Sequence, residues 1–246
     1  MQTKRASFPF LRTVSARMIE RYIFNFRMRP DELAKKLPVP WLEPQVVNGW
    51  CAVSFCILWL DRLTVAPIPP VIPFQTLSSA YRIGVIDTSQ SEPEASVYIT
   101  NRWADNKLIA ALAPLVLLDT IPAIDAAHGH TPDDVVHVQM SQRDGRHIFS
   151  AQARSSETFE SEVFDSLDDF VGFIKGGVSS YAPSTKPGAL SKVNLHKEDV
   201  QYAPLAATIE FSALHHEWSD TTMEFDSAVR ATGSKYVWTY KGLFGS

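Results

Sequence analysis

The sequence is poor in cysteine and has no long hydrophobic run, and these two gaps exclude several classes of protein. Two cysteines, Cys51 and Cys56, occur in 246 residues, too few for a disulfide scaffold and without the spacing of a C-x-x-C site. Because they are five residues apart in one predicted strand, they should point to opposite faces and not pair with each other. We interpret both as small apolar side chains in a reducing compartment, the cytoplasm.

The longest apolar run, Leu108 to Leu118, is far shorter than the ~20 residues of a membrane-spanning helix, so we expect no membrane association. The first residues carry four Lys or Arg side chains before the first acid, Glu20, as in a transit peptide. Pro9 interrupts any amphipathic helix there. We interpret this stretch as a basic lead-in strand and leave a targeting role as the alternative.

Familiar catalytic signatures are also missing. There is no G-x-G-x-x-G, no P-loop, no G-x-S-x-G and no H-E-x-x-H, which weakens nucleotide, serine-hydrolase and zinc-protease interpretations. Two histidine groups, His128 with His130 and His215 with His216, lack a third ligand at a suggestive spacing. We interpret them as turn or surface histidines and expect no metal and no cofactor. The net charge of −4 argues against a nucleic-acid partner, which would need a clustered basic face.

What the sequence does contain is a series of strand patterns. Residues 20–28 alternate, with Tyr22, Phe24, Phe26 and Met28 on one face and Arg21, Ile23, Asn25 and Arg27 on the other. Residues 50–60 form an apolar run typical of a strand buried on both faces. The sequence "RDGR" at 143–146 predicts a hairpin turn. Further strands are predicted at 79–87, 95–101, 135–140, 146–154, 193–202, 206–214 and 235–240.

Helices are few and short. Pro30 suits a first helical position, and Pro38 ends the helix after Leu37. Asp105 is a candidate cap for a helix from Asn106, and Ser166 with Asp169 predicts a capped helix that ends at Gly176. The proline-rich residues 65–74 and residues 179–192 are predicted as long loops. With no repeat and no composition shift, we predict a single α+β domain, mainly β, over residues 1–246.

A cationic set on separate segments gives the best candidate site. Its members are Arg27, Arg82, Arg102 and Lys107. Each alone is more often a surface cation, but cations that meet in a polar cavity favour a carboxylate ligand, which guanidinium grips with two hydrogen bonds. A lysine placed there loses its proton more easily, and the neutral amine is a nucleophile toward carbonyl carbon.

The order of these segments resembles a known family. Residues 25–45, "NFRMRPDELAKKLPVPWLEPQ", and "NGWCAVSFCILWLDRL" with its proline-rich loop are similar to the acetoacetate decarboxylase-like superfamily, in particular its bacterial branch catalogued as a conserved domain of unknown function. The resemblance runs from about residue 8 to about residue 240. It implies a cone-shaped antiparallel β-barrel with a few flanking helices and an interior pocket.

The same resemblance implies a lysine pair that forms a Schiff base with an oxo acid. Arg27 matches the family arginine, and "DNKL" at 105–108 falls where the lysine pair is expected, with Asn106 in place of the reactive lysine and Lys107 in place of its neighbour. Shifted by one residue, Lys107 becomes the nucleophile. No match is found for the family glutamates.

Three hypotheses follow. The first is a lyase acting on a small oxo acid or related carbonyl compound, with Lys107 as the catalytic amine and Arg27, Arg82, Arg102 and Asn106 as substrate-binding residues. The second is a non-catalytic barrel that binds a small molecule, for example a carboxylate. The third is an interaction role through the apolar loop at 65–74. Homo-oligomerisation is left open.

Overall fold

The computed structural model describes residues 13–66, 74–131 and 134–245. The proline-rich loop and the basic N-terminal stretch lie largely outside these residues. Among the described residues, no helix combines the length and the apolar character needed to cross a membrane. The helices are α1 (Pro30–Ala34), α2 (Lys107–Val116), α3 (Leu167–Gly176) and α4 (Ala213–Glu217). The strands are β1 (Thr13–Met28), β2 (Leu42–Pro44), β3 (Val46–Val47), β4 (Trp50–Ala66), β5 (Phe74–Asp87), β6 (Glu94–Ala104), β7 (Ile124–His130), β8 (Val135–Gln142), β9 (His147–Ser155), β10 (Ser179–Pro183), β11 (Ala189–Lys197), β12 (Gln201–Ser212) and β13 (Glu224–Gly245).

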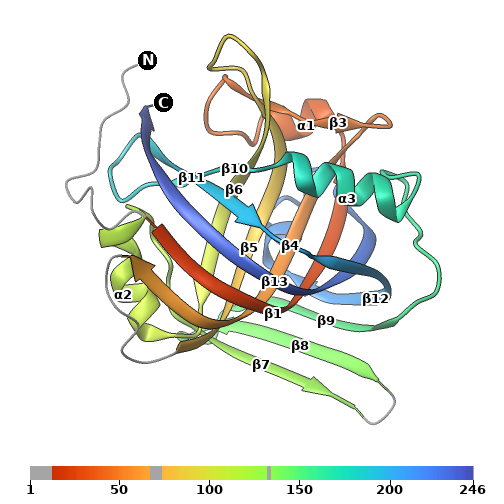
Figure 1. The fold of residues 1–246 in the computed structure, drawn as a ribbon. Coiled ribbons are helices and arrows are strands. Elements are labelled where there is room, and N and C mark those ends of the chain that lie inside the picture. The colour runs from red at the N-terminus through yellow and green to blue at the C-terminus, as the bar shows by residue number, and fades with distance from the viewer. Residues whose placement is uncertain (1–12, 67–73, 132–133, 246) are drawn as a thin grey trace.

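The sheet closes into a ring of paired strands. The order is β1, β4, β5, β6, β10, β11 and β13, and β13 pairs again with β1. The step from β6 to β10 is parallel and three residue pairs long, whereas the other steps of the ring are antiparallel. From β13 the sheet continues through β12, β9, β8 and β7. Figure 1 shows β1 and β13 side by side, with β7 to β9 below them. This confirms the predicted mainly β architecture.

The alternation of β1 divides the core into two parts. On the outer face of the ring, Phe24 packs against Phe149 of β9, with ring centroids 5.0 Å apart. Phe55 of β4 stacks on the same ring at 4.1 Å. On the inner face, Ile23 and Cys56 belong to a second buried cluster. Strand β4 is therefore buried on both faces, as its continuous apolar run predicts.

The first three helices begin close to the predicted positions. Pro30 is the first residue of α1, and the Ser166 side chain caps α3 by accepting a hydrogen bond from the Asp169 backbone N–H at 3.1 Å. At α2 the cap is Asn106 and not Asp105, because the Asn106 side chain accepts from the Leu108 N–H. The Asp105 carboxylate accepts from the backbone N–H of Leu77 in β5 instead.

Several elements differ from the sequence prediction: β7 and α4 were not expected, and α1 ends at Ala34 and not at Leu37. Two further differences concern strands and loops. The strand expected over 193–202 is two strands, because β11 ends at Lys197 and the chain turns at Asp199, whose φ is 46°. The loop expected over 179–192 contains β10 and the start of β11. Pairing with distant strands decides both cases, and a local residue pattern does not carry that information.

Candidate active site

The strand ring encloses a cavity with a volume of about 180 Å³. All seven strands of the ring contribute to its wall, and α2 and α3 add apolar side chains. A cavity of ~150 Å³ holds benzene, so this one has room for a small organic molecule. No Asp or Glu occurs among the lining residues that the structure describes.

Four cationic side chains from different strands line this cavity. Sheet register brings two of them together, because Arg82 of β5 lies opposite Ser54 of β4, and Ser54 lies opposite Asn25 of β1. Arg82 therefore shares the inner face with Asn25 and with Arg21, four residues earlier. The four cations are Arg21 (β1), Arg82 (β5), Arg102 (β6) and Lys197 (β11).

Arg21 is the most deeply buried of the four, with 1% of its surface exposed. Its Nη2 donates to Cys56 Sγ at 3.2 Å, while its Nε and Nη1 have no hydrogen-bond partner. Burial by itself would lower the pKa of Arg21, but the charge of Cys56 outweighs it and raises this pKa above its usual value. Two unused donors on a buried guanidinium are suited to an anionic ligand that enters the cavity.

Lys197 lies at the end of β11. Its Nζ donates to the backbone carbonyl of Ile174 in α3 at 3.0 Å. Burial, followed by the like charges of Arg21 and Arg82, lowers the pKa of Lys197 to about 7. Near pH 7 a large fraction of the molecules therefore has Lys197 as a neutral amine, which is the nucleophilic form.

Arg82 and Arg102 differ in how their charge is balanced. Burial lowers the pKa of Arg82 to about 10, aided by Arg21 and Arg102, so it remains cationic at neutral pH, and its Nε has no hydrogen-bond partner. Arg102 forms an ion pair with the buried Asp119, with Nε and Oδ2 2.9 Å apart. Arg82 is thus available to a ligand, whereas Arg102 already has a counter-ion.

The structure places Arg27 outside this cavity. It is not a lining residue, and its Nη2 forms an ion pair with Glu224 Oε2 at 2.8 Å. Its guanidinium also lies over the Trp50 ring, 5.3 Å from the centroid. Arg27 lies on the same face of β1 as Arg21, as predicted. It is six residues further along the strand, where Glu224 of β13 is its partner.

Lys107 and Asn106 also lie outside the cavity. Lys107 is exposed at the first position of α2, and Asn106 serves as the helix cap. Lys107, Ala111 and Leu115, four residues apart, form the exposed stripe of α2, while Leu112 and its neighbours face the cavity. The expectation that Lys107 lies in an enclosed pocket is therefore wrong, because helical periodicity turns it toward solvent.

Arg82 and Arg102 are in the cavity, as expected, and Arg21, Cys56 and Lys197 are the members that sequence reasoning missed. The alternation of residues 20–28 already put Arg21 on the face of Arg27, so a signal for Arg21 was present. Lys197 stands between His196 and Glu198 in a polar part of the strand predicted over 193–202, and that stretch gives no such signal.

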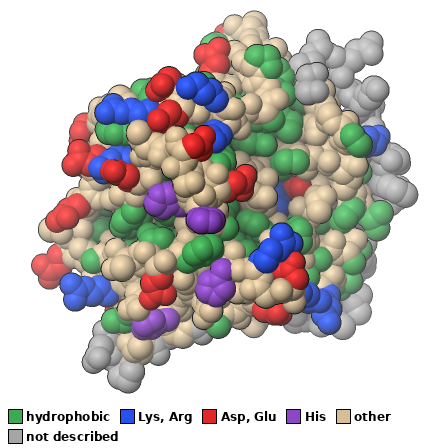
Figure 2. Space-filling view, turned by 180° about the vertical axis from the view of Figure 1, so that it is seen from behind, with side chains coloured by type: hydrophobic (Ala, Val, Ile, Leu, Met, Phe, Trp, Pro, Cys, Tyr) green, Lys and Arg blue, Asp and Glu red, His purple; other side chains and the backbone are tan. Residues whose placement is uncertain are grey.

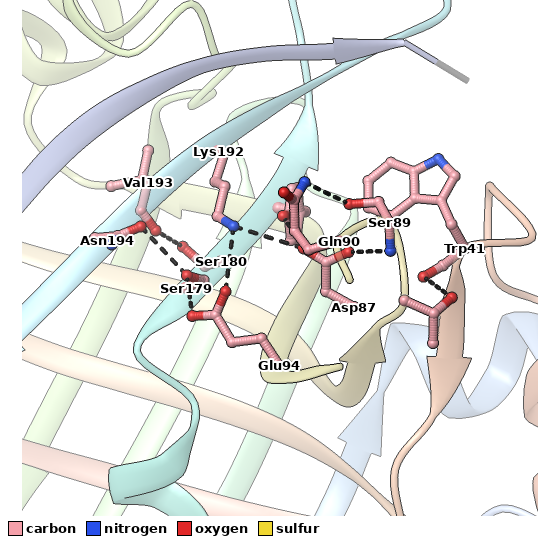
Figure 3. Close-up of polar contacts among 12 residues, drawn as sticks. Trp41, Asp87, Ser89, Gln90, Glu94, Ser179, Ser180, Lys192, Val193 and Asn194 are labelled. Atoms are coloured by element: carbon pink, nitrogen blue, oxygen red, sulfur yellow. Dashed lines mark hydrogen bonds and ion pairs between the residues drawn. The ribbon is translucent and has the colours of Figure 1, made fainter. Parts of the chain in front are cut away.

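A second charged cluster lies on the outer face of the ring (Figure 3). Lys192 of β11 approaches Asp87 Oδ2 at 3.5 Å and Glu94 Oε2 at 3.4 Å. Asp87 also accepts a short hydrogen bond from the hydroxyl of Tyr181. Burial by itself would raise the pKa of Asp87, but hydrogen bonds from Ser89 and Tyr181 and the charge of Lys192 hold this pKa below its usual value. Every charge in this cluster has a partner, so we interpret it as structural.

The histidines do not assemble into a metal centre within the described residues. Figure 2 shows histidine side chains at the surface of one face, among hydrophobic atoms and charges of both signs. No three His, Cys, Asp or Glu side chains are grouped so that they could hold a metal ion, as far as the structure describes them. The groups that line the cavity include the amine of Lys197, the thiol of Cys56 and three guanidinium groups.

Comparison with known proteins places the fold. No family model matches the chain, and no curated protein matches it. Among solved structures, an acetoacetate decarboxylase-like enzyme from Sphingomonas wittichii RW1 is 14% identical with a TM-score of 0.59, and the match covers 96% of this chain and 94% of that one. Acetoacetate decarboxylase from Legionella pneumophila is 14% identical with a TM-score of 0.63, covering 100% and 90%.

The enduracididine biosynthesis enzyme MppR, solved in complex with pyruvate, is also 14% identical. Its TM-score is 0.58, and the match covers 100% of this chain and 98% of that one. At such identities the likeness concerns the fold, and it spans nearly the whole length of each protein. The chain has the same fold as these acetoacetate decarboxylase-like structures, as the order of its sequence segments suggests.

Proposed function

We propose that this protein is a lyase-like enzyme that acts on a small oxo acid or related carbonyl compound through the amine of Lys197. The observation that carries the proposal is the composition of the cavity. A lysine with a pKa of about 7 lines the same cavity as Arg21 and Arg82, and no acid lines that cavity among the described residues. An oxo acid offers the two groups that such a site can use, a carbonyl carbon and a carboxylate.

The proposed chemistry assigns each group one task. The neutral Lys197 amine attacks the carbonyl carbon, and loss of water gives a protonated imine. Arg21, through its unpartnered Nε and Nη1, and Arg82 hold the carboxylate. When a bond to the carbon next to the imine breaks, its electron pair moves into the imine and forms an enamine. Protonation of the enamine and hydrolysis then return the free lysine.

Two of the structural neighbours support this substrate class. One was solved with pyruvate, a 2-oxo acid, and another is an acetoacetate decarboxylase, whose name specifies a 3-oxo acid. The proposal differs from the sequence hypothesis in the lysine that it assigns, because Lys107 is exposed on α2 and Lys197 lines the cavity.

Reductive trapping tests the proposal. The protein is incubated with pyruvate or acetoacetate, reduced with borohydride, and mapped by peptide mass spectrometry. We expect the reduced adduct on Lys197, its loss in Lys197→Met, and its full retention in Lys107→Met, the matched control at an exposed lysine. A folded wild-type protein that forms no adduct with either acid, or forms it on Lys107, contradicts the proposal.

A non-catalytic binding cavity is the second candidate, and the unused guanidinium donors of Arg21 and Arg82 favour it. These arginines can hold a carboxylate without any covalent step. Calorimetric titration of Lys197→Met with pyruvate separates the two candidates when it is combined with trapping. Binding in wild type and variant alike, with no adduct and no turnover, supports the binding cavity and contradicts the lyase.

A further inference from the structure

Cys56 is the cavity group that the proposed imine chemistry leaves unused. It lies in β4, on the inner face of the ring, opposite Ile23 of β1, and it lines the cavity. Its sulfur accepts the hydrogen bond from Arg21 Nη2 at 3.2 Å. Cys51, five residues earlier in the same strand, belongs to the outer hydrophobic cluster instead. The two cysteines therefore provide a comparison within one strand.

The charge balance of the cavity favours the thiolate form of Cys56. Arg21 is 1% exposed, and no Asp or Glu lines the cavity among the described residues. A buried cation without a counter-ion is strongly disfavoured. The Cys56 sulfur is in hydrogen-bond contact with this guanidinium, and its thiolate form would place a negative charge beside the buried cation.

The surroundings of Cys56 and Cys51 shift the pKa of the two thiols in opposite directions. Burial by itself would raise the pKa of Cys56, but the charges of Arg21 and Arg82 outweigh it and lower this pKa below its ordinary value. Burial with no such neighbours raises the pKa of Cys51 to about 12. Both cysteines are 0% exposed, so the difference between them is the arginine beside Cys56, which favours the thiolate, the form in which cysteine reacts.

We propose that Cys56 is a second nucleophile of the cavity, whose thiolate adds to small carboxylates that carry an electrophilic carbon, such as 2,3-unsaturated 4-oxo acids. Arg21 carries the argument for a ligand independently of the thiol. It is a buried polar side chain in the cavity wall, and two of its donors, Nε and Nη1, have no partner. They can hold a carboxylate while Nη2 contacts the sulfur.

The addition needs no further reagent, because the thiolate supplies the electron pair and Lys197 or water supplies the proton. The sulfur electron pair forms a C–S bond to the carbon β to the ketone, and the C=C π pair moves to the neighbouring carbon to give an enolate. That carbon then takes a proton from the ammonium form of Lys197 or from water. With an α-halo acid as a probe, the same thiolate forms the C–S bond while the halide leaves with the C–X electron pair.

Alkylation of the native protein tests the proposal, with iodoacetate as the anionic probe and iodoacetamide as its neutral counterpart. Peptide mapping follows Cys56 and Cys51 separately. We expect Cys56 to be labelled at least about tenfold faster than Cys51. We also expect its iodoacetate-to-iodoacetamide rate ratio to exceed that of free N-acetylcysteine by about tenfold, because the cavity attracts the anion. Equal rates at the two cysteines, no native labelling of Cys56, or a ratio equal to that of the free thiol overturns it.

Variants make the test specific. Arg21→Gln should reduce the rate ratio at Cys56 toward that of the free thiol, and an unchanged ratio in a folded variant overturns the role of Arg21. If Arg21→Gln does not fold, the wild-type ratio still decides. In Lys197→Met, labelling of Cys56 should persist although the borohydride adduct is lost. The proposals on Lys197 and Cys56 therefore fail separately.

Discussion

Two lysines of strand β11 occupy opposite environments. Lys192 and Lys197 are five residues apart, so the alternation of the strand points them to opposite faces of the sheet. Lys192 lies on the outer face between two carboxylates, 3.5 Å from Asp87 and 3.4 Å from Glu94, and over the Tyr181 ring at 5.0 Å (Figure 3). Lys197 lies on the inner face with Arg21 and Arg82 as its charged neighbours.

The difference shows that two side chains of the same type in one strand can have opposite charged neighbours, carboxylates for Lys192 and arginines for Lys197. Lys192 connects β11 to Asp87 of β5 and to Glu94 of β6. These contacts lie near the step of the ring where β6 and β10 share three residue pairs. The unpaired lysine is held in a state that favours the neutral amine. Cys51 and Cys56 repeat this contrast in β4, another strand of the ring, with a thiol in the outer hydrophobic cluster and an arginine-bound sulfur on the inner face.

Removal of the paired lysine should have the largest effect on stability. Lys192→Met leaves Asp87, which is 0% exposed, without its cation. Breaking a buried pair from one side destabilises by about 3 kcal/mol or more, so urea unfolding should show a loss of that size. Lys107→Met, at an exposed lysine, should stay within about 0.5 kcal/mol of wild type. A Lys192→Met variant as stable as that control would show that the outer cluster contributes no net stability.

Removal of Lys197, the lysine without a carboxylate partner, should instead increase the free energy of unfolding. The pKa of Lys197 is about 7 in the folded protein against 10.5 for an ordinary lysine, so between these values the unfolded chain binds more protons than the folded one. The unfolding free energy therefore rises with pH across this window, and the penalty is fully present below pH 7.

Lys197→Met removes that penalty. We expect a gain of about 2 kcal/mol at pH 7, less than the full pKa shift implies because the partly exposed amine is screened by solvent. The gain should shrink as the pH approaches 10.5, and urea unfolding at pH 7 and pH 10 measures it. A loss of stability at pH 7 would mean that the aliphatic part of Lys197 and its bond to the Ile174 carbonyl outweigh the charge effect.

The pH dependence of imine trapping sharpens the comparison further. Below a pKa of about 7 the Lys197 amine is protonated and cannot attack, so the trapping rate should fall about tenfold for each further pH unit, which corresponds to ~1.4 kcal/mol. Above pH 8 the rate should level off. A half-point near pH 10 would show that the arginines do not act on Lys197, and that it behaves like an ordinary lysine.

Sequence reasoning predicted the fold and the faces of β1 but not the centre of the site. Strand alternation, caps and the 143–146 turn are local features, so residues 20–28, Ser166 and Gly145 could be interpreted from the sequence. Arg21 was placed on the correct face by the same alternation. The choice of Arg27 in its place failed because nothing in the sequence indicates that Glu224, almost two hundred residues away, supplies its partner.

Lys197 was beyond local reasoning for a related reason. Its neighbours in sequence are His196 and Glu198, both exposed, while the residues that lower its pKa come from β1 and β5. The closing of the ring brings these strands together. When each strand contributes a single side chain to a site, the sequence contains no motif for that site. The prediction therefore chose Lys107, the lysine nearest to a pattern known from the family.

The smallest expected effect is at Arg27, the paired counterpart of Arg21 in β1. Its ion pair with Glu224 is partly exposed, with 23% and 65% of the two side chains accessible, and such a pair contributes about 0.5 kcal/mol. Arg27→Ala should therefore change urea unfolding by about that amount and leave the Lys197 adduct yield unchanged. Arg21 has no carboxylate partner in the cavity wall, so Arg21→Gln should reduce the yield. If Arg27→Ala abolishes trapping while Arg21→Gln does not, the carboxylate lies at the end of β1, and the contrast between paired and unpaired cations does not locate the site.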